Sequence, residues 1–286
     1  MALHQRFEFR PPRQPVLVMH LEGWVDAGLG GTTALAALLE ANDTEPVATF
    51  DGEELLDMRA RRPILHIENG QHRGLTWREI SMALGTDGAG NDVLFLAGPE
   101  PDFRWRAFCA EVTELCVELG VRLAVGLGAF PAPAPHTRAV RLAATASDES
   151  LAAGIGFVPG SIQVPAGIQA ALEQSLAAAG IPAIGLWARV PHYVAGLPYP
   201  AASVALLAGL ASTAGLTVDT TALQGAADLA IQRVDALISN STEHQEMVRK
   251  LEHQLDTTEG NPLQLGEIPS GDEIAAELER FLRGEG

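Results

Sequence analysis

The chain has 286 residues, of which 47% are hydrophobic and 19% are charged, so it holds enough apolar material for a substantial core and is not disordered over most of its length. Its formal net charge is −17, which excludes nucleic acid and anionic membrane surfaces as main partners. The short basic run Arg59–Arg62 is interpreted as a solvated loop.

Apolar strand-like runs alternate with helix-like segments along residues 16–214. Strands are expected at residues 16–21, 47–50, 64–67, 77–82, 93–96, 122–127, 140–146 and 183–187. Helices are expected at residues 32–40, 105–119, 166–179 and 201–214. The alternation predicts a mostly parallel sheet covered by helices on both faces. Residues 64–67 and 77–82 are expected to pair as an antiparallel element across Asn69-Gly70.

Three features along these elements bear on the compartment. Cys109 and Cys116 lie seven residues apart on one expected helix, roughly 10 Å along its axis, so a disulfide is not expected. The helix after Pro200 is shorter than the ~20 residues that span a bilayer and is interpreted as a core helix. The N-terminal residues lack the apolar core of a signal peptide. A cytoplasmic protein is therefore expected.

The pattern changes after about Thr220. Apolar residues keep helical spacing from Leu223 to Leu255, which predicts one long helix or two broken ones. A capping-box spacing at residues 270–273 predicts a last helix at residues 273–282. We expect an α/β domain at residues 1–220 and a helical extension at residues 221–286. The extension either packs on the domain or forms a coiled interaction arm.

A glycine-rich segment, GWVDAGLGG at residues 23–31, connects the first strand to the first helix. Such a turn at a helix N-terminus is a possible anion site, with Gly23, Trp24, Asp26 and Gly28 as candidate residues. The segment lacks the third glycine of a dinucleotide fingerprint and the lysine of a phosphate loop. The favoured interpretation is structural: the glycines supply the backbone angles of a turn, and Asp26 caps a backbone N–H.

Other chemical motifs are absent from the sequence. No histidine pair stands four residues apart on a helix and no CxxC occurs, so neither a metal nor a cofactor is expected. No G-x-S-x-G nucleophile elbow occurs either; Ser203, in a small-residue near match, is interpreted as a packing residue. No catalytic residue is assigned.

Two further loops carry polar side chains. His136 and Arg138 follow the strand at residues 122–127, and His192 and Tyr193 follow the strand at residues 183–187. Loops after the carboxyl ends of parallel strands share one edge of a sheet, where ligands usually bind. The sequence therefore predicts that these side chains gather near Asp26. Rigid surface loops without chemical function remain the alternative.

Four motifs occur together in this order: GWVDAG, PHTR, FVPGSIQVPAG and WARVPHYVAGLPYPAAS. Together they resemble the proteasome assembly chaperone 2 family, in its actinobacterial-type branch, over about residues 15–216. The resemblance implies a three-layer α/β/α sandwich of the phosphorylase/hydrolase-like kind, a helical C-terminal extension and homo-oligomerisation. Relatives in that family dock on proteasomes through a tail with tyrosine next to last. Glu285 stands there in this chain, so proteasome docking is not expected.

Two functions remain open at this stage. The leading one is a non-enzymatic, protein-binding, assembly-chaperone-like protein that forms a homo-oligomer. The alternative is a phosphorylase/hydrolase-like enzyme or small-molecule binder. In that alternative Asp26 acts as acid or base, His136 or His192 transfers protons and Arg138 holds an anion.

Overall fold

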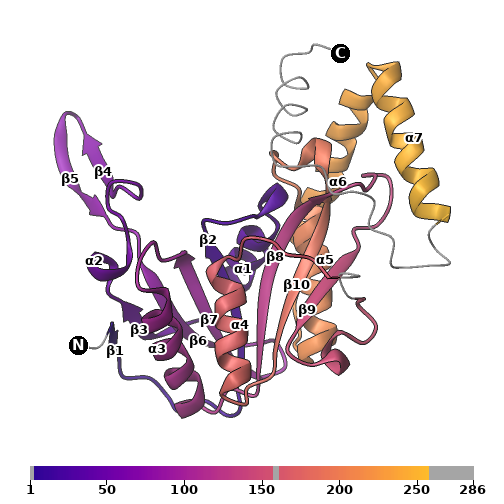
Figure 1. Ribbon diagram of the computed structural model, residues 1–286. Helices are drawn as coiled ribbons and strands as arrows, with labels where there is room; N and C mark the ends of the chain where they lie inside the picture. Colours follow the sequence, from indigo (N-terminus) through magenta and orange to yellow (C-terminus); the bar gives the residue numbers. More distant parts are fainter. Residues whose placement is uncertain (1–2, 157–160, 258–286) are drawn as a thin grey trace. The chain divides into compact units, whose positions relative to one another are not determined.

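The computed structural model describes residues 3–156 and 161–257 of the chain (Figure 1). The strands are β1 (His4–Arg6), β2 (Val16–Glu22), β3 (Glu45–Phe50), β4 (Ile64–Glu68), β5 (Gln71–Thr76), β6 (Ile80–Thr86), β7 (Asp92–Pro99), β8 (Leu123–Ala132), β9 (Leu142–Ala146) and β10 (Ala183–Pro191). The α-helices are α1 (Gly30–Glu40), α2 (Gly52–Leu55), α3 (Trp105–Glu118), α4 (Ile168–Ala178), α5 (Pro200–Ala214), α6 (Thr221–Ile238) and α7 (Thr242–Thr257).

Eight of the strands form one mixed sheet in the order β1-β3-β6-β7-β2-β8-β10-β9. The central strand β2 pairs in parallel with β7 and β8, whereas the pairs β1–β3, β3–β6, β6–β7 and β9–β10 are antiparallel. The side chains of Val16–Leu21 are buried on both sides of β2, which accounts for its continuous apolar sequence. The predicted α/β fold with a mixed sheet is confirmed.

The described residues fall into two compact units. One unit takes its residues from Met1–Trp24, Leu39–Gly126 and Pro165–Ala183, and the other from Val25–Leu38, Leu127–Val164 and Ile184–Gly286. The glycine-rich segment therefore contributes Gly23 and Trp24 to the first unit, and Asp26 and Gly28 to the second. The predicted boundary near residue 220 is a different division, drawn from composition, and stays a prediction.

The first unit has its core between the strands and helices α3 and α4. Phe50 and Phe108 meet edge to face in this core, with ring centroids 5.0 Å apart. Cys109 and Cys116 on α3 are buried and free, as predicted. Burial raises the pKa of Cys109 to about 11 and that of Cys116 to about 12, so neither thiol ionises at neutral pH.

A two-stranded hairpin, β4–β5, extends away from β3 and β6 in the same unit (Figure 1). Its turn lies at Asn69-Gly70, as predicted, and both residues have positive φ, 51° and 78°. The predicted pairing partner was wrong: β4 pairs with Gln71–Thr76, and residues 80–86 form β6 of the main sheet. The tight turn requires the partner strand to begin directly after Gly70, although Gln71–Gly74 lack the apolar alternation that favours a strand.

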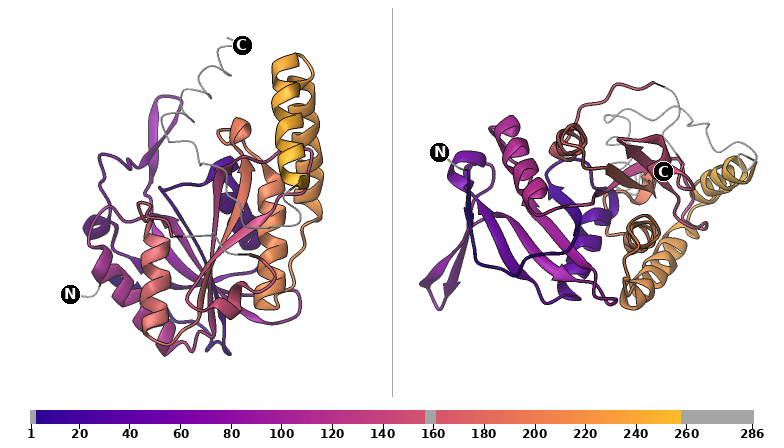
Figure 2. Two further views of the ribbon diagram at one scale, coloured as in Figure 1. Left: turned by 45° about the vertical axis from the view of Figure 1, so that its right-hand side comes forward. Right: turned by 90° about the horizontal axis from the view of Figure 1, so that it is seen from below.

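The second unit holds the helices of the C-terminal part. Helix α5 begins at Pro200 and ends at Ala214; Gly215 caps it with a left-handed φ of 68°, and the helix packs against α6. The segment after residue 220 forms two helices, α6 and α7, which contact each other and lie side by side in the left view of Figure 2. The helix predicted at residues 273–282 lies outside the described residues. None of the helices in residues 3–156 and 161–257 has the length and apolar composition that crossing a membrane requires.

Candidate functional site

Asp26 fixes the start of α1. One of its carboxylate oxygens accepts a hydrogen bond from the backbone N–H of Gly31 at 2.7 Å. The other accepts from the N–H and the hydroxyl of Thr32, at 3.0 and 2.7 Å. The first N–H groups of a helix attract anions, and here the protein's own carboxylate occupies them. This is the capping role that the sequence analysis favoured for Asp26.

The glycines of the same segment are required by close packing and by backbone conformation. Gly28 has a φ of 64°, and a Cβ atom there would lie 2.7 Å from the Cβ of Tyr199. The N–H of Gly28 donates to the carbonyl of Ala195, and the N–H of Tyr199 donates to the carbonyl of Gly28, both at 2.8 Å. The glycine turn is therefore tied to the segment that follows β10. In the first unit, Gly23 has a φ of 141° and Trp24 is half exposed.

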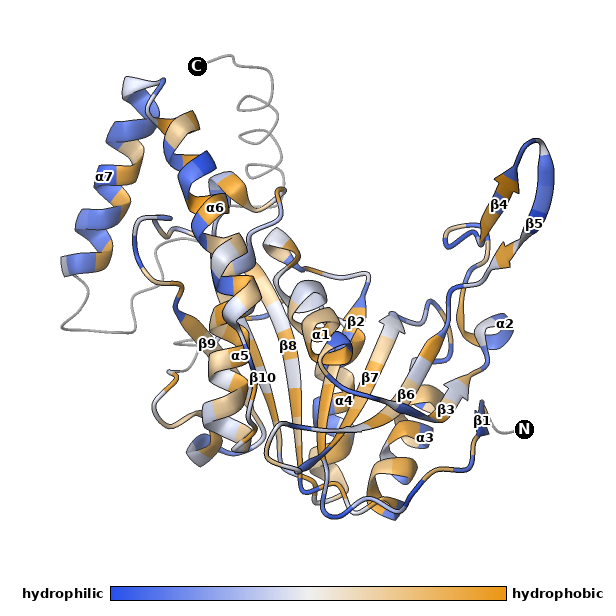
Figure 3. Ribbon diagram, turned by 180° about the vertical axis from the view of Figure 1, so that it is seen from behind, coloured by the Kyte–Doolittle hydropathy of each residue, from blue (hydrophilic) through white to orange (hydrophobic). Residues whose placement is uncertain are grey.

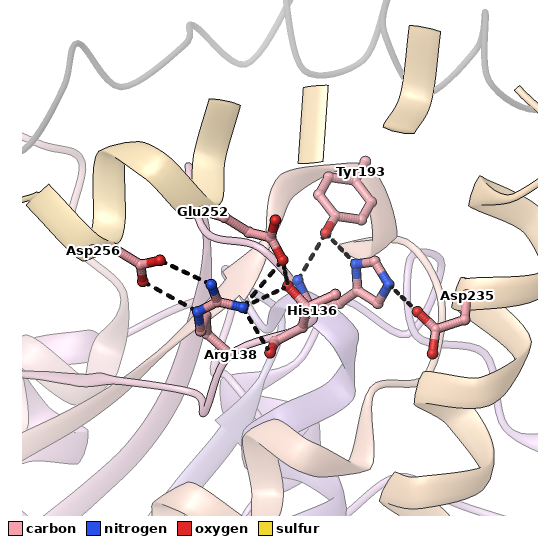
Figure 4. A network of polar contacts seen from close by, with 7 residues as sticks. His136, Arg138, Tyr193, Asp235, Glu252 and Asp256 are labelled. Carbon is pink, nitrogen blue, oxygen red and sulfur yellow. Dashed lines mark hydrogen bonds and ion pairs between the residues drawn. The ribbon is translucent and has the colours of Figure 1, made fainter. Parts of the chain in front are cut away.

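His136, Tyr193 and Asp235 form a hydrogen-bonded chain in the second unit (Figure 4). His136 lies in the loop after β8 and is 2% exposed. Its Nδ1 is 2.6 Å from the hydroxyl oxygen of Tyr193, and its Nε2 is 2.9 Å from a carboxylate oxygen of Asp235 on α6. The backbone N–H of His136 also donates to the Tyr193 hydroxyl, at 2.8 Å. We call these three side chains the His136 cluster.

The phenol of Tyr193 is the protonated member of the His136 cluster. Burial raises the pKa of the Tyr193 phenol, so the hydroxyl stays protonated at neutral pH. Its oxygen accepts from the backbone N–H of His136 and lies against Nδ1 of the ring, while Nε2 lies against Asp235. Both ring nitrogens of the histidine are thus occupied.

Arg138, two residues further along the loop, binds acidic residues on α7 (Figure 4). Its Nε and Nη2 donate to the two carboxylate oxygens of Asp256 at 3.1 and 2.8 Å, and its Nη1 donates to Glu252 at 3.1 Å. The hydrogen bond from Arg138 lowers the pKa of the Asp256 carboxyl. The Arg138 guanidinium, which was predicted to hold an external anion, therefore binds two carboxylates of the same chain.

Several of the predicted site residues are brought together. His136 and His192 both lie against Tyr193, with ring centroids 5.7 and 5.4 Å away, and the turn at Gly28 is bonded to the segment that follows Tyr193. A role for these residues in ligand or partner binding stays a prediction.

Three acidic partners in this region, Asp235, Glu252 and Asp256, were not predicted from the sequence. Glu252 and Asp256 stand four residues apart, which places both carboxylates on one face of a helix, and that spacing was available in the sequence. Nothing in the sequence paired them with Arg138. Within residues 3–156 and 161–257 no group of histidine, cysteine or acidic residues is arranged to hold a metal ion.

A family model described as PAC2 family matches residues 20–238 of the chain. Among solved structures, the Mycobacterium tuberculosis protein Rv2714, of unknown function, is 36% identical, with 90% of this chain and 89% of that chain covered and a TM-score of 0.82. The M. tuberculosis proteasome-assembly chaperone homologue Rv2125 is 32% identical, with 82% and 99% covered and a TM-score of 0.76. A PAC2 family protein from Streptomyces avermitilis is 35% identical, with 82% and 99% covered and a TM-score of 0.73. No curated protein matches the chain.

Proposed function

The chain belongs to the PAC2 family, and we propose that it is a cytoplasmic, assembly-chaperone-like protein. It forms a homo-oligomer and works by binding other protein chains. A relative with 32% identity is a proteasome-assembly chaperone homologue, which favours a protein partner over a small substrate. The two buried free thiols suit a reducing compartment.

The observation that carries this proposal is the apolar surface of the β4–β5 hairpin. Its large apolar side chains are between 42% and 61% exposed: Ile64, Leu65, Ile67, Leu75 and Trp77. Leu65 and Ile67 share one face of β4, and Leu65 lies opposite Leu75 on β5. Figure 3 shows β4 coloured largely as hydrophobic.

A second copy of the chain is the occupant we assign to this surface. A two-stranded hairpin is at best marginally stable in water, and one with a large exposed apolar surface gains stability when that surface is covered. The strands of the hairpin also carry His66, His72 and Arg73 beside Glu68. The electrostatic repulsion between two copies that each carry a net charge of −17 is therefore weak at the hairpin. The hairpins of two copies are therefore suited to contact each other.

The test is the oligomeric state of matched variants, measured by light scattering during size-exclusion chromatography. Ile67→Lys places a charge on the hairpin, and Val117→Lys places one at a similarly exposed position on α3, 54% against 61% exposed. We expect the wild-type protein and the Val117 variant to be oligomeric and the Ile67 variant to be a monomer. A monomeric wild type, or an Ile67 variant with unchanged mass, would contradict the proposal.

Binding of other protein chains has a separate test. We expect pull-downs with the wild-type protein to recover protein partners under gentle conditions. Recovery of no partner would contradict this part of the proposal.

A further inference from the structure

One flank of α6 exposes large apolar side chains. The helix contacts α5 and α7 and buries Ala227, Val234 and Ile238. Leu229 and Leu237 lie on another side of the helix and are 55% and 49% exposed. They belong to a stripe of exposed residues at intervals of four, three, four and four, which places the stripe along one side of the helix. We call this stripe the α6 flank, and its members are Ala222, Ala226, Leu229, Arg233 and Leu237.

The opposite flank of the same helix is polar and has partners. Asp235 binds His136, and Asp228 accepts a hydrogen bond from the side chain of Gln224 at 3.1 Å. The α6 flank instead leaves two leucines in contact with water. Apolar residues at this spacing are typical of a helix surface that packs against a further helix.

The charge of the α6 flank restricts what can cover it. Arg233 lies between the two leucines, and its guanidinium forms no ion pair with any other described residue. None of the five residues of the flank is acidic, so two α6 flanks packed on each other would offer neither arginine a carboxylate. The fitting occupant is therefore an amphipathic helix with a carboxylate beside its apolar side.

The chain itself contains a segment of this kind. The sequence predicts a helix at residues 273–282, outside the described residues, and Ile274, Leu278 and Phe281 recur there at intervals of four and three. Glu277 stands three residues after Ile274 and four before Phe281, which places its carboxylate beside the apolar side of that helix.

The chain between α7 and this segment is long enough to reach the α6 flank. Helix α7 contacts α6 and ends at Thr257, so the chain leaves α7 within one helix length of α6, ~24 Å for 16 residues. Residues 258–272 follow, and an extended chain of that length spans up to ~50 Å.

We propose that the α6 flank binds residues 273–282 of the same chain as an amphipathic helix. The apolar side of that helix covers the two leucines of the flank, and Glu277 pairs with Arg233. The flank is then unavailable to other protein chains while the segment is bound. The contact belongs to α6 and not to the hairpin, so it is independent of the proposed oligomer.

Alkylation of an introduced cysteine in the full chain tests the contact. Cys109 and Cys116 are buried, so Leu229→Cys supplies the thiol that reacts with N-ethylmaleimide. Protection is the rate with Leu278→Lys and Phe281→Lys in the segment, divided by the rate with the wild-type segment. We expect a protection of at least about tenfold, because covering one large apolar side chain is worth that factor or more.

The matched control is Gln224→Cys, an exposed position on the opposite flank of the same helix. The two lysine substitutions should leave its rate unchanged. Equal rates at position 229 with either segment, or equal protection at positions 224 and 229, would overturn the proposal. If Leu229→Cys does not fold, Leu237→Cys on the same flank takes its place in the comparison.

Dilution separates the chain's own segment from that of a second copy. Protection within one chain should be unchanged over about a hundredfold dilution, because binding within a chain does not depend on protein concentration. Protection that disappears on dilution would assign the covering segment to a second copy and overturn the proposal.

A charge exchange tests the assigned ion pair. Arg233→Glu places two carboxylates side by side and should lower the protection at position 229 about twofold to fivefold, the range of an exposed ion pair. Adding Glu277→Arg should restore the protection, whereas Glu279→Arg, on the other side of the predicted helix, should not. Failure of Glu277→Arg to restore it, or equal restoration by Glu279→Arg, would contradict the pairing.

Discussion

The loop after β8 contributes to two groups of polar side chains that differ in how completely they are paired. In the His136 cluster, both ring nitrogens and the Tyr193 hydroxyl have partners. Beside Pro135, Val140 and Leu255, the Nε of Arg189 on β10 is buried without a partner among the described residues. Both groups lie in the second unit and close to the C-terminal helices. The fully paired group contributes to stability, whereas the buried Nε of Arg189, which lacks a partner, costs stability.

The largest effect is expected when the paired group is broken at its centre. His136→Ala removes a side chain that is 1% exposed and leaves the Tyr193 hydroxyl without its partner on the histidine ring. Loss of the two side-chain hydrogen bonds and the resulting cavity should reduce the free energy of unfolding by about 3 kcal/mol. Denaturant unfolding measures it. A loss of less than about 1 kcal/mol would show that the cluster contributes little to stability.

The two tyrosines of the chain sharpen the comparison because both are buried and only Tyr193 is paired. Tyr193→Phe removes a hydroxyl that bonds His136 twice and should cost about 1 to 2 kcal/mol. Tyr199→Phe removes a buried hydroxyl that has no partner among the described residues, so stability should stay the same or rise slightly. Denaturant unfolding of both variants gives the comparison. Equal losses in the two variants would contradict the distinction between paired and unpaired groups.

Much of the fold could be predicted from the sequence because it depends on local pattern. The apolar run of residues 16–21 is buried on both sides of β2, as a central strand requires. Pro200 and Gly215 mark the two ends of α5. The hairpin shows the limit of such patterns. Asn69-Gly70 identified the turn, but Gln71–Gly74 carry too little apolar signal to identify the partner strand.

The polar contacts were less predictable because they join residues far apart in the chain. His136 and Tyr193 were expected near one another from the topology of parallel strands, and they share a hydrogen bond. Their link to Asp235 spans 99 residues of sequence, and no local rule selects that acid among the 36 acidic residues of the chain. The opposite position of Arg141 and Arg189 depends on strand register, which follows from the whole sheet.

The attachment of α7 provides a smaller test, because its ion pairs are exposed to solvent. Arg138→Gln removes the hydrogen bonds to Asp256 and Glu252 and should leave global stability nearly unchanged. Amide exchange in α7 should become faster, while exchange in α5, the helix of the buried core, stays as in the wild type. Unchanged exchange in α7 would show that Leu251 and the other buried residues of that helix hold it without the ion pairs.

The smallest expected effect is the pH dependence of the same attachment. Arg138 lowers the pKa of Asp256, so the folded chain releases that proton more readily than the unfolded chain does. The resulting stabilisation is fully present above the ordinary carboxyl pKa of about 4 and disappears as pH falls through the lower folded value. Differences in α7 exchange between wild type and Arg138→Gln should therefore be largest near neutral pH and shrink below about pH 4. A difference that persists in acid would mean that Arg138 holds α7 through the packing of its side chain and not through carboxylate charge.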